Sequence, residues 1–259
     1  MSGDGVRLTL VRNATLRLEL AGRTLLVDPC LAPKDSMDPF AGGARNPTVD
    51  LPMPAADVVT GIDAVFVSHL HPDHWDAAAA EVLPRDVPVL APAEVAAGLG
   101  EQGFTRVTVL EAGHDWHGVR LVRTDGRHGH GAIAEAMGRV SGLVLVPPDG
   151  PRVYWAGDTV WCDAVERAIA EHVPGVIVTH SGGATLPGHE DDPIIMDVPE
   201  TLRTCAAAPE ATIVAVHLEA LDHCPVTRAG LRRAAEAAGV GGLRLRIPAD
   251  GETVLLGTG

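Results

Sequence analysis

Short apolar runs recur along the whole chain, and Gly, Pro, Asn or Asp separates each run from the next. Near the start, Leu16, Leu18 and Leu20 alternate with charged residues, which is the pattern of a strand with one buried face. Later runs such as 64–67 and 213–216 are apolar throughout and indicate fully buried strands. We expect strands at 6–11, 14–20, 24–28, 64–67, 88–91, 107–110, 118–124, 140–146, 152–156, 176–179, 212–216, 243–245 and 253–256.

The segments between many of these strands have helical character. Several are rich in Ala, which favours helices, and the last one places Leu231, Ala234, Ala235 and Ala238 on one face. We expect helices at 75–82, 91–99, 164–172, 199–207 and 227–238. Strands that alternate with helices are typical of a sheet covered by helices. Because no Pro- or Ser-rich linker divides the chain, we expect a single domain over residues 1–259.

One long segment, 30–57, does not fit this alternation. It contains five prolines and the pair Gly42-Gly43, which preclude long regular elements. Apolar residues such as Met37 and Phe40 argue against disorder, and a loop of this length in a compact domain is usually functional. We expect this loop to cover a substrate, with Trp161 as a further part of the wall.

The composition narrows the class of protein. Hydrophobic residues make up 46% of the chain, which suffices for a large core, and the formal net charge is -14. Because nucleic-acid backbones and anionic membranes are bound through Lys and Arg, this charge argues against both as partners. The four scattered cysteines lack a C-x-x-C pair, and neither a secretory signal nor a membrane-spanning run is visible. We expect a cytoplasmic protein with a small-molecule substrate, and a homo-oligomer remains open.

The densest chemistry follows the apolar strand at 64–67. Within six residues the chain has three imidazoles and one carboxylate in the order H-x-H-x-D-H, namely His69, His71, Asp73 and His74. Such a set is too polar to form a core, but it has the nitrogen and oxygen ligands that divalent transition metals prefer. The first two fall on one side of an extended segment, and the proline after them bends the chain so that the others converge. This stretch indicates the centre of a metal site.

Further polar residues stand where apolar strands end. Asp28 ends an early strand, and Asp158, His180 and His217 each follow a later one. Sites are commonly built at the ends of the elements of a scaffold, and a carboxylate there can bridge two cations. These four positions therefore extend the candidate site.

The H-x-H-x-D-H loop, the turn Gly157-Asp158-Thr159 and the strand that ends at His217 resemble the metallo-β-lactamase superfamily. The opening strands that end in Val27-Asp28-Pro29 are similar to the L-ascorbate-6-phosphate lactonase-like branch of its metal-dependent hydrolases. The resemblance covers most of the chain. It implies an α+β fold in the form of a four-layer αββα sandwich, with two mixed β-sheets flanked by helices.

The resemblance also implies a pair of divalent metal ions and their ligands. It assigns the first metal to His69, His71 and His128, the second to Asp73, His74 and His217, and the bridging position to Asp158. In the Gly-rich loop at 125–131, His130 is the alternative to His128 as the third ligand of the first metal. Zinc is the expected metal, and manganese or iron would suit the same ligands.

Two cations of this kind hold a water between them and lower its pKa to about 7. The implied activity is hydrolysis of a small ester, lactone, amide or phosphoester by the bridging hydroxide, which Asp73 would orient. His180 and His223 are the candidate acids for the leaving group. Asp28 and Asp76 are candidates to accept the free N–H of ligand histidines.

Three alternative interpretations compete with this hydrolase. They are a phosphodiesterase or nuclease of the same fold, an iron-dependent oxygenase, and a non-catalytic metal-binding protein. The acidic balance argues against the nuclease, and the full ligand set argues against the non-catalytic protein. The sequence has no G-x-S-x-G motif, so serine-based hydrolysis has no support. The charged run from His189 to Asp192 is interpreted as a solvated loop.

Overall fold

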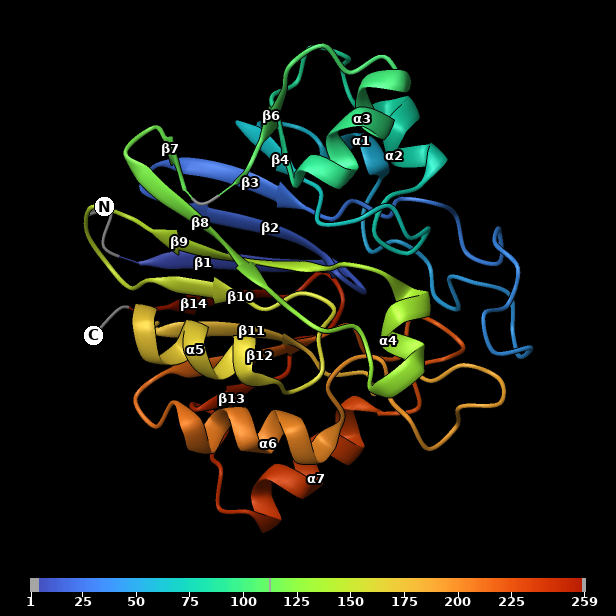
Figure 1. Ribbon diagram of the computed structural model, residues 1–259, viewed down its shortest axis with the longest axis vertical. Coiled ribbons are helices and arrows are strands. Elements are labelled where there is room, and N and C mark those ends of the chain that lie inside the picture. Colours follow the sequence, from blue (N-terminus) through green and yellow to red (C-terminus); the bar gives the residue numbers. More distant parts are fainter. Residues whose placement is uncertain (1–4, 112, 258–259) are drawn as a thin grey trace.

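The three strands expected at the start of the chain form an antiparallel meander in the computed structural model, which describes residues 5–111 and 113–257. They are β1 (Val6–Arg12), β2 (Thr15–Leu20) and β3 (Arg23–Val27) (Figure 1). Leu18 of β2 lies opposite Leu8 of β1 and Leu25 of β3. The alternating leucines of neighbouring strands therefore meet on one face, where cross-strand pairs stabilise a sheet.

The first sheet grows from both edges of this meander. The strands β4 (Ala64–Phe66), β5 (Val89–Ala91) and β6 (Val107–Val109) continue it in parallel beyond β3. The connections contain α1 (Ala55–Val58), α2 (Ala77–Val82) and α3 (Ala93–Glu101). The last strand, β14 (Thr253–Leu256), returns to pair antiparallel with β1, so the order is β14-β1-β2-β3-β4-β5-β6.

The second sheet is mixed in the same way. Its order is β13-β12-β11-β10-β9-β8-β7, antiparallel from β7 to β10 and parallel from β10 to β13. These strands are β7 (His114–Trp116), β8 (Val119–Asp125), β9 (Ser141–Val146), β10 (Val153–Trp155), β11 (Val176–His180), β12 (Thr212–Val216) and β13 (Leu245–Arg246). The helices are α4 (Gly131–Met137), α5 (Asp163–His172), α6 (Val198–Ala207) and α7 (Arg228–Ala237).

Three apolar clusters hold the layers together. The central cluster lies between the sheets, where Phe66 of β4 meets Trp155 of β10 edge to face with ring centroids 5.6 Å apart. A second cluster packs α1, α2 and α3 on the first sheet, and a third packs α5, α6 and α7 on the second. Each fully buried Leu or Val contributes about 1.5–3 kcal/mol through removal of apolar surface from water. The four-layer αββα sandwich expected from the sequence is confirmed (Figure 1).

The elements differ from expectation in several places, among them β7, a strand that was not expected, and β13, which covers Leu245–Arg246 instead of residues 243–245. The helix α2 begins at Ala77 instead of residue 75, because Asp76 accepts the N–H of Ala79 as its N-cap and Trp75 turns into the core. The helix α4 was not expected in the Gly-rich stretch, since it begins at a glycine and has no side-chain cap.

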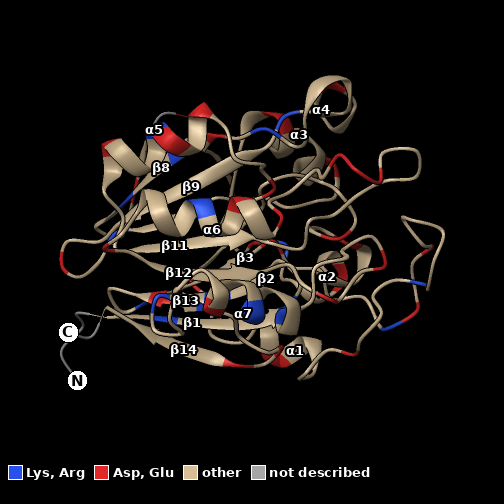
Figure 2. Ribbon diagram, turned by 90° about the horizontal axis from the view of Figure 1, so that it is seen from below, with Lys and Arg blue, Asp and Glu red and all other residues tan. Residues whose placement is uncertain are grey.

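The charged residues lie mainly on the helices and loops (Figure 2). Figure 2 shows the acidic residues spread over helices and loops, whereas the basic ones form separate short stretches. None of the described helices combines the length and hydrophobicity that crossing a membrane requires. The carboxyl ends of β4, β10, β11 and β12 point to one rim of the sandwich, where the loops that carry the polar residues gather (Figure 1).

Candidate metal centre

The H-x-H-x-D-H stretch forms a tight turn directly after β4. The carbonyl of His71 accepts hydrogen bonds from the backbone N–H of His74 and of Trp75, each at 2.9 Å. Pro72 lies inside this turn, where its missing N–H costs nothing. The reversal brings Asp73 and His74 back toward His69, so that side chains from an extended segment and from a turn face the same space.

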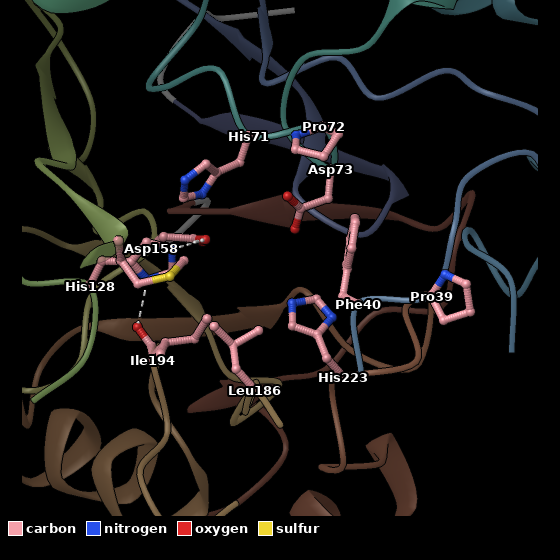
Figure 3. A pocket seen from close by; sticks show the side chains of 11 residues that line it. Pro39, Phe40, His71, Pro72, Asp73, His128, Asp158, Leu186, Ile194 and His223 are labelled. Atoms are coloured by element: carbon pink, nitrogen blue, oxygen red, sulfur yellow. Dashed lines mark hydrogen bonds and ion pairs between the residues drawn. The ribbon is translucent and has the colours of Figure 1, made fainter. Parts of the chain in front are cut away.

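The structure brings the seven predicted ligands together from both halves of the chain. They are His69, His71, Asp73, His74, His128, Asp158 and His217. Asp158 is central: its Oδ2 lies 3.1 Å from Nε2 of His74, 3.5 Å from Nε2 of His128 and 3.8 Å from Nε2 of His69. Figure 3 shows Asp158 close to His71 and His128 in the lining of the pocket.

The side chains around Asp158 form two groups. Donor atoms of His69, His71 and His128 lie within 4.8 Å of one another, and so do those of His74, Asp158, His180 and His217. Asp73 joins the second group, with its Oδ2 3.3 Å from Nε2 of His217. This grouping has the form of the two metal sites expected from the sequence, with His180 as an addition.

Several of these histidines have a partner at the ring nitrogen that points away from the cluster. Nδ1 of His74 donates to Asp28 at 2.7 Å, and the same carboxylate accepts the hydroxyl of Ser68 at 2.6 Å. That hydroxyl lies 2.8 Å from Nδ1 of His69, so Asp28 supports two histidines at once. Such partners fix the ring and leave Nε2 free for a cation.

The loop at 125–131 carries two histidines that lie in different surroundings. His128 is buried, donates through Nδ1 to the carbonyl of Ile194 at 2.8 Å and directs Nε2 toward Asp158. His130 is largely exposed and lies 3.6 Å from the carboxylate of Glu200. The structure therefore places His128, and not His130, in the cluster.

His217 has an unusual partner for its outer nitrogen. Its Nδ1 lies 3.5 Å from the sulfur of Cys224, and its backbone N–H donates to the carbonyl of Asn13 at 3.0 Å. The side chain of Asn13 in turn donates to the carbonyl of Asp73. The turn after β1 thus ties together two predicted ligands that are far apart in sequence.

The charges of the cluster fit a site for cations. Burial raises the pKa of Asp73 and of Asp158, but the neighbouring His74 lowers both well below the usual range. Burial likewise lowers the pKa of His74, but Asp158 and Asp73 raise it well above its usual value. Burial and then His74 lower the pKa of His69, which keeps that ring neutral.

Unpartnered nitrogens supply the structural test of whether metal ions fit here. Among the described residues, Nε2 of His69, of His74 and of His217 is buried without a hydrogen-bond partner. A buried donor or acceptor left unsatisfied costs about 1–3 kcal/mol, so three of them around the carboxylate of Asp158 need a ligand. Nitrogen and carboxylate donors suit zinc, manganese or iron. Because bound metal would displace protons from the rings, metal affinity rises with pH.

The two candidate acids lie in different positions. His180 is completely buried behind the cluster, with Nδ1 2.5 Å from Oδ1 of Asp158, and burial lowers its pKa to about 4. His223 lines the pocket, and its Nδ1 has no hydrogen-bond partner within the part of the chain that the structure describes. Burial also lowers the pKa of His223, so its ring is neutral at neutral pH.

A cavity of about 400 Å³ opens in front of the cluster. Its floor holds His71, Asp73, His128 and Asp158, and its remaining wall is mostly apolar (Figure 3). The apolar residues come from four segments and are Pro39, Phe40, Pro72, Met137, Leu186 and Ile194. Of the described residues that line it, none is Lys or Arg.

Two expectations about the surroundings of the site are wrong. Trp161 packs in the outer core of the second sheet, where its N–H donates to Glu166 and its ring lies under the guanidinium of Arg203. Asp76 accepts from the backbone N–H of Ala79 and of Ala32, so it caps a helix and anchors a loop instead of orienting a ligand histidine.

Sequence reasoning missed several residues of the site. Ser68 directly precedes the first histidine, so its hydroxyl was open to recognition from the motif. The charged run at 189–192 is exposed as expected, but Ile194, Ile195 and Met196 after it are buried and pass close to the cluster. No local pattern distinguishes the carbonyl of Ile194 or the thiol of Cys224 as a partner of a histidine.

Comparison with known proteins agrees with this geometry. A family model described as the beta-lactamase superfamily domain matches residues 23–218. The UPF0173 protein YddR of Bacillus subtilis (strain 168) is 36% identical over 96% of this chain and 99% of its own length. A UPF0173 metal-dependent hydrolase of Azorhizobium caulinodans is 28% identical over 71% of this chain and 77% of its own.

One solved structure is similar over the whole fold. The crystal structure of isothiocyanate hydrolase from Delia radicum gut bacteria has a TM-score of 0.90 and 39% identity, covering 96% of this chain and 98% of that one. The lactonase-like branch suggested by the sequence stays a prediction. The matched model, the relatives and the four-layer fold agree: the chain belongs to the beta-lactamase superfamily and is a metal-dependent hydrolase.

Proposed function

We propose that this hydrolase acts on a small, uncharged, apolar electrophile at a centre of two divalent metal ions. The observation that carries the proposal is the position of Asp158, which lies between two groups of histidines at the floor of an apolar cavity. His69, His71 and His128 would hold one cation, and Asp73, His74 and His217 the other. When bound, the cations would supply an activated water and polarise the electrophilic centre.

The side chains of the chain itself divide the remaining work. Asp73 reaches from the turn into the cavity and would orient the attacking water. His223 faces it across the cavity, and its neutral ring would relay a proton from the attacking water to the leaving group (Figure 3). His180 lies behind Asp158 and would orient that carboxylate, which favours a positioning role over that of an acid.

The cavity wall supports an uncharged substrate. We find no Lys or Arg among the described lining residues, so only the metal ions would pair with the negative charge of a phosphoester. Esters, lactones and isothiocyanates carry an electrophilic carbon and no charge. The relative at 39% identity is an isothiocyanate hydrolase, which makes an isothiocyanate our first candidate. The overall reaction, R–N=C=S + H₂O → R–NH₂ + COS, balances without a further reactant.

The cysteines and the net charge support the proposed location and the proposed kind of substrate. All four cysteines are free and buried, which supports the proposed location in the reducing cytoplasm. The net charge of -14 supports a small-molecule substrate over a nucleic acid.

The test is a substrate panel with protein of measured metal content. Zinc- and manganese-loaded protein would be assayed with benzyl isothiocyanate, p-nitrophenyl acetate and bis(p-nitrophenyl) phosphate. We expect about two metal equivalents per chain and chelator-sensitive turnover of the isothiocyanate or the ester. Turnover of the phosphodiester in their place would contradict the proposed substrate class. A protein that binds no metal would contradict the proposed metal centre.

The two histidines of the Gly-rich loop provide matched variants. His128→Ala should lose metal and activity, because Nε2 of this residue faces Asp158. His130→Ala should keep both, because that side chain is directed to Glu200. The reverse result would move the third ligand of the first metal to His130.

A further inference from the structure

One carboxylate outside the predicted metal ligands, that of Asp222, holds a distant loop against the cavity. We define the pocket loop as residues 37–46, the central part of the long proline-containing segment. Its two ends are joined by hydrogen bonds between the backbones of Met37 and Asn46, at 2.7 and 3.0 Å. Between these ends the loop is mostly exposed, except that Pro39 and Phe40 line the cavity.

Both oxygens of Asp222 accept hydrogen bonds from the pocket loop. Oδ1 accepts the backbone N–H of Phe40 at 2.9 Å and the side-chain amide of Asn46 at 2.8 Å. Oδ2 accepts the backbone N–H of Ala41 and of Gly43, each at 3.0 Å. The backbone N–H of Asp222 donates back to the side-chain oxygen of Asn46 at 2.9 Å. Five hydrogen bonds thus join two segments about 180 positions apart.

The close approach depends on the residue opposite the carboxylate. A Cβ at Gly43 would lie 3.3 Å from Oδ2 of Asp222, so a larger residue would press on the acceptor. The hydrogen bonds from Asn46 and from the loop backbone outweigh burial and lower the pKa of Asp222, so the carboxylate is ionised at neutral pH. An ionised acceptor strengthens each of these bonds.

These hydrogen bonds of Asp222, which we call the clamp, act on two neighbouring residues of the cavity wall. Phe40, whose N–H it holds, packs edge to face on the ring of His223, with centroids 5.1 Å apart and planes at 88°. His223 directly follows Asp222 in the chain. Phe40 also packs against the buried cluster that contains Ile133, Ile194 and Leu221. One carboxylate therefore fixes the apolar wall and the histidine beside it (Figure 3).

We propose that Asp222 is a positioning residue that determines which substrates fit, because it holds Phe40 and His223 in the cavity wall. The inference about substrate fit rests on the proposed function, whereas the clamp itself does not. A substrate with a ring or long chain would contact Phe40, and a methyl-sized one would not reach it.

The experiment replaces Asp222 by Asn in the full chain. Asp222→Asn keeps the shape of the side chain, but it leaves one acceptor oxygen for the four loop donors that two oxygens accept in the unaltered protein. Hydrogen–deuterium exchange of the backbone amides in the pocket loop should become about tenfold faster or more. The KM for benzyl isothiocyanate should rise about tenfold while that for methyl isothiocyanate changes little, with metal content near that of the unaltered protein.

Glu219→Gln is the matched control on the same segment. This carboxylate accepts from the backbone N–H and the guanidinium of Arg228, so it holds the start of α7 and not the pocket loop. It should leave exchange in the pocket loop and the ratio of the two KM values unchanged. An equal effect of both variants would mean general loosening of the segment and would overturn the inference.

The two levels of the proposal fail in different ways. Unchanged exchange in Asp222→Asn overturns the clamp, whatever the substrate. Faster exchange with an unchanged KM ratio upholds the clamp but overturns its role in substrate fit. If the unaltered protein hydrolyses neither isothiocyanate, the proposed substrate class falls, and exchange still decides whether the clamp exists.

Discussion

At the scale of single residues, the histidines of the candidate site differ in the group that contacts Nδ1, the ring nitrogen that points away from the cluster. His74 and His69 share support from Asp28 and Ser68, whereas His128 depends on a backbone carbonyl. These contacts fix each ring before a cation arrives, so the entropy of ordering the ligands is paid during folding. Metal affinity should therefore depend on residues that never touch the metal.

The variant Asp28→Asn tests this dependence. The amide keeps the size of the side chain but weakens the acceptor for His74 and for Ser68. Metal affinity, measured by competition with a chromophoric chelator, should fall about 10- to 100-fold.

Asp63→Asn provides the comparison on the same sheet. That carboxylate accepts from the backbone of Thr24 and the guanidinium of Arg23 at the start of β4, away from the rim with the cluster. It should leave metal affinity unchanged. Equal metal affinity of the Asp28 and Asp63 variants would show that the support of His74 is dispensable.

At the scale of elements, one helix cap also organises the long loop. Asp76 caps α2 through Ala79 and accepts the N–H of Ala32, which lies at the start of the segment 30–57. The position of this loop therefore depends on the amino end of the helix that follows the turn with the predicted metal ligands.

Asp76→Ala should destabilise the protein more than a simple cap deletion. Loss of an N-cap costs about 0.5–2 kcal/mol, and the unsatisfied N–H of Ala32 adds about 1 kcal/mol or more. Thr227 caps α7, because its hydroxyl accepts the backbone N–H of Gly230. Thr227→Ala should lower the free energy of unfolding by about 1 kcal/mol or less at this exposed position. Urea unfolding of metal-free protein measures both, and equal values would refute the double role of Asp76.

At the scale of the whole molecule, the chain closes its first sheet with its last strand. In β14, Leu256 faces the central core opposite Val6, whereas Leu255 is 60% exposed on the other side. The stability of the sandwich therefore depends on residues about 250 positions from the strand that they cover.

Leu256→Ala should lower the free energy of unfolding by about 2–5 kcal/mol, because it leaves a cavity between the sheets. Leu255→Ala should change it by about 0.5 kcal/mol or less, since that side chain is mostly in water. Denaturant unfolding of the two variants compares neighbouring positions of one strand. A similar loss for both would mean that β14 does not pack as described.

The expectations that were based on residues adjacent in the sequence mostly agree with the structure. Alternation of leucines predicted the opening meander, and the long apolar runs predicted the buried strands of both sheets. The turn from His69 to His74 concentrates four donors within six residues, so it could be selected as the candidate metal site without coordinates. By contrast, α4 has a glycine at its start and no capping side chain, so no local signal distinguished it from a loop.

The sequence by itself determined most of the strands and helices and the chemical kinds of the candidate ligands, because periodicity and local spacing are properties of adjacent residues. Only the tertiary structure decided that His128 faces Asp158 while His130 does not, and that Asp28 supports His74 while Asp76 caps a helix. It also showed Trp161 in the core and Asp222 on the pocket loop. Apart from the helix cap by Asp76, these facts depend on contacts between residues distant in the chain, and such contacts form only when both sheets close on each other.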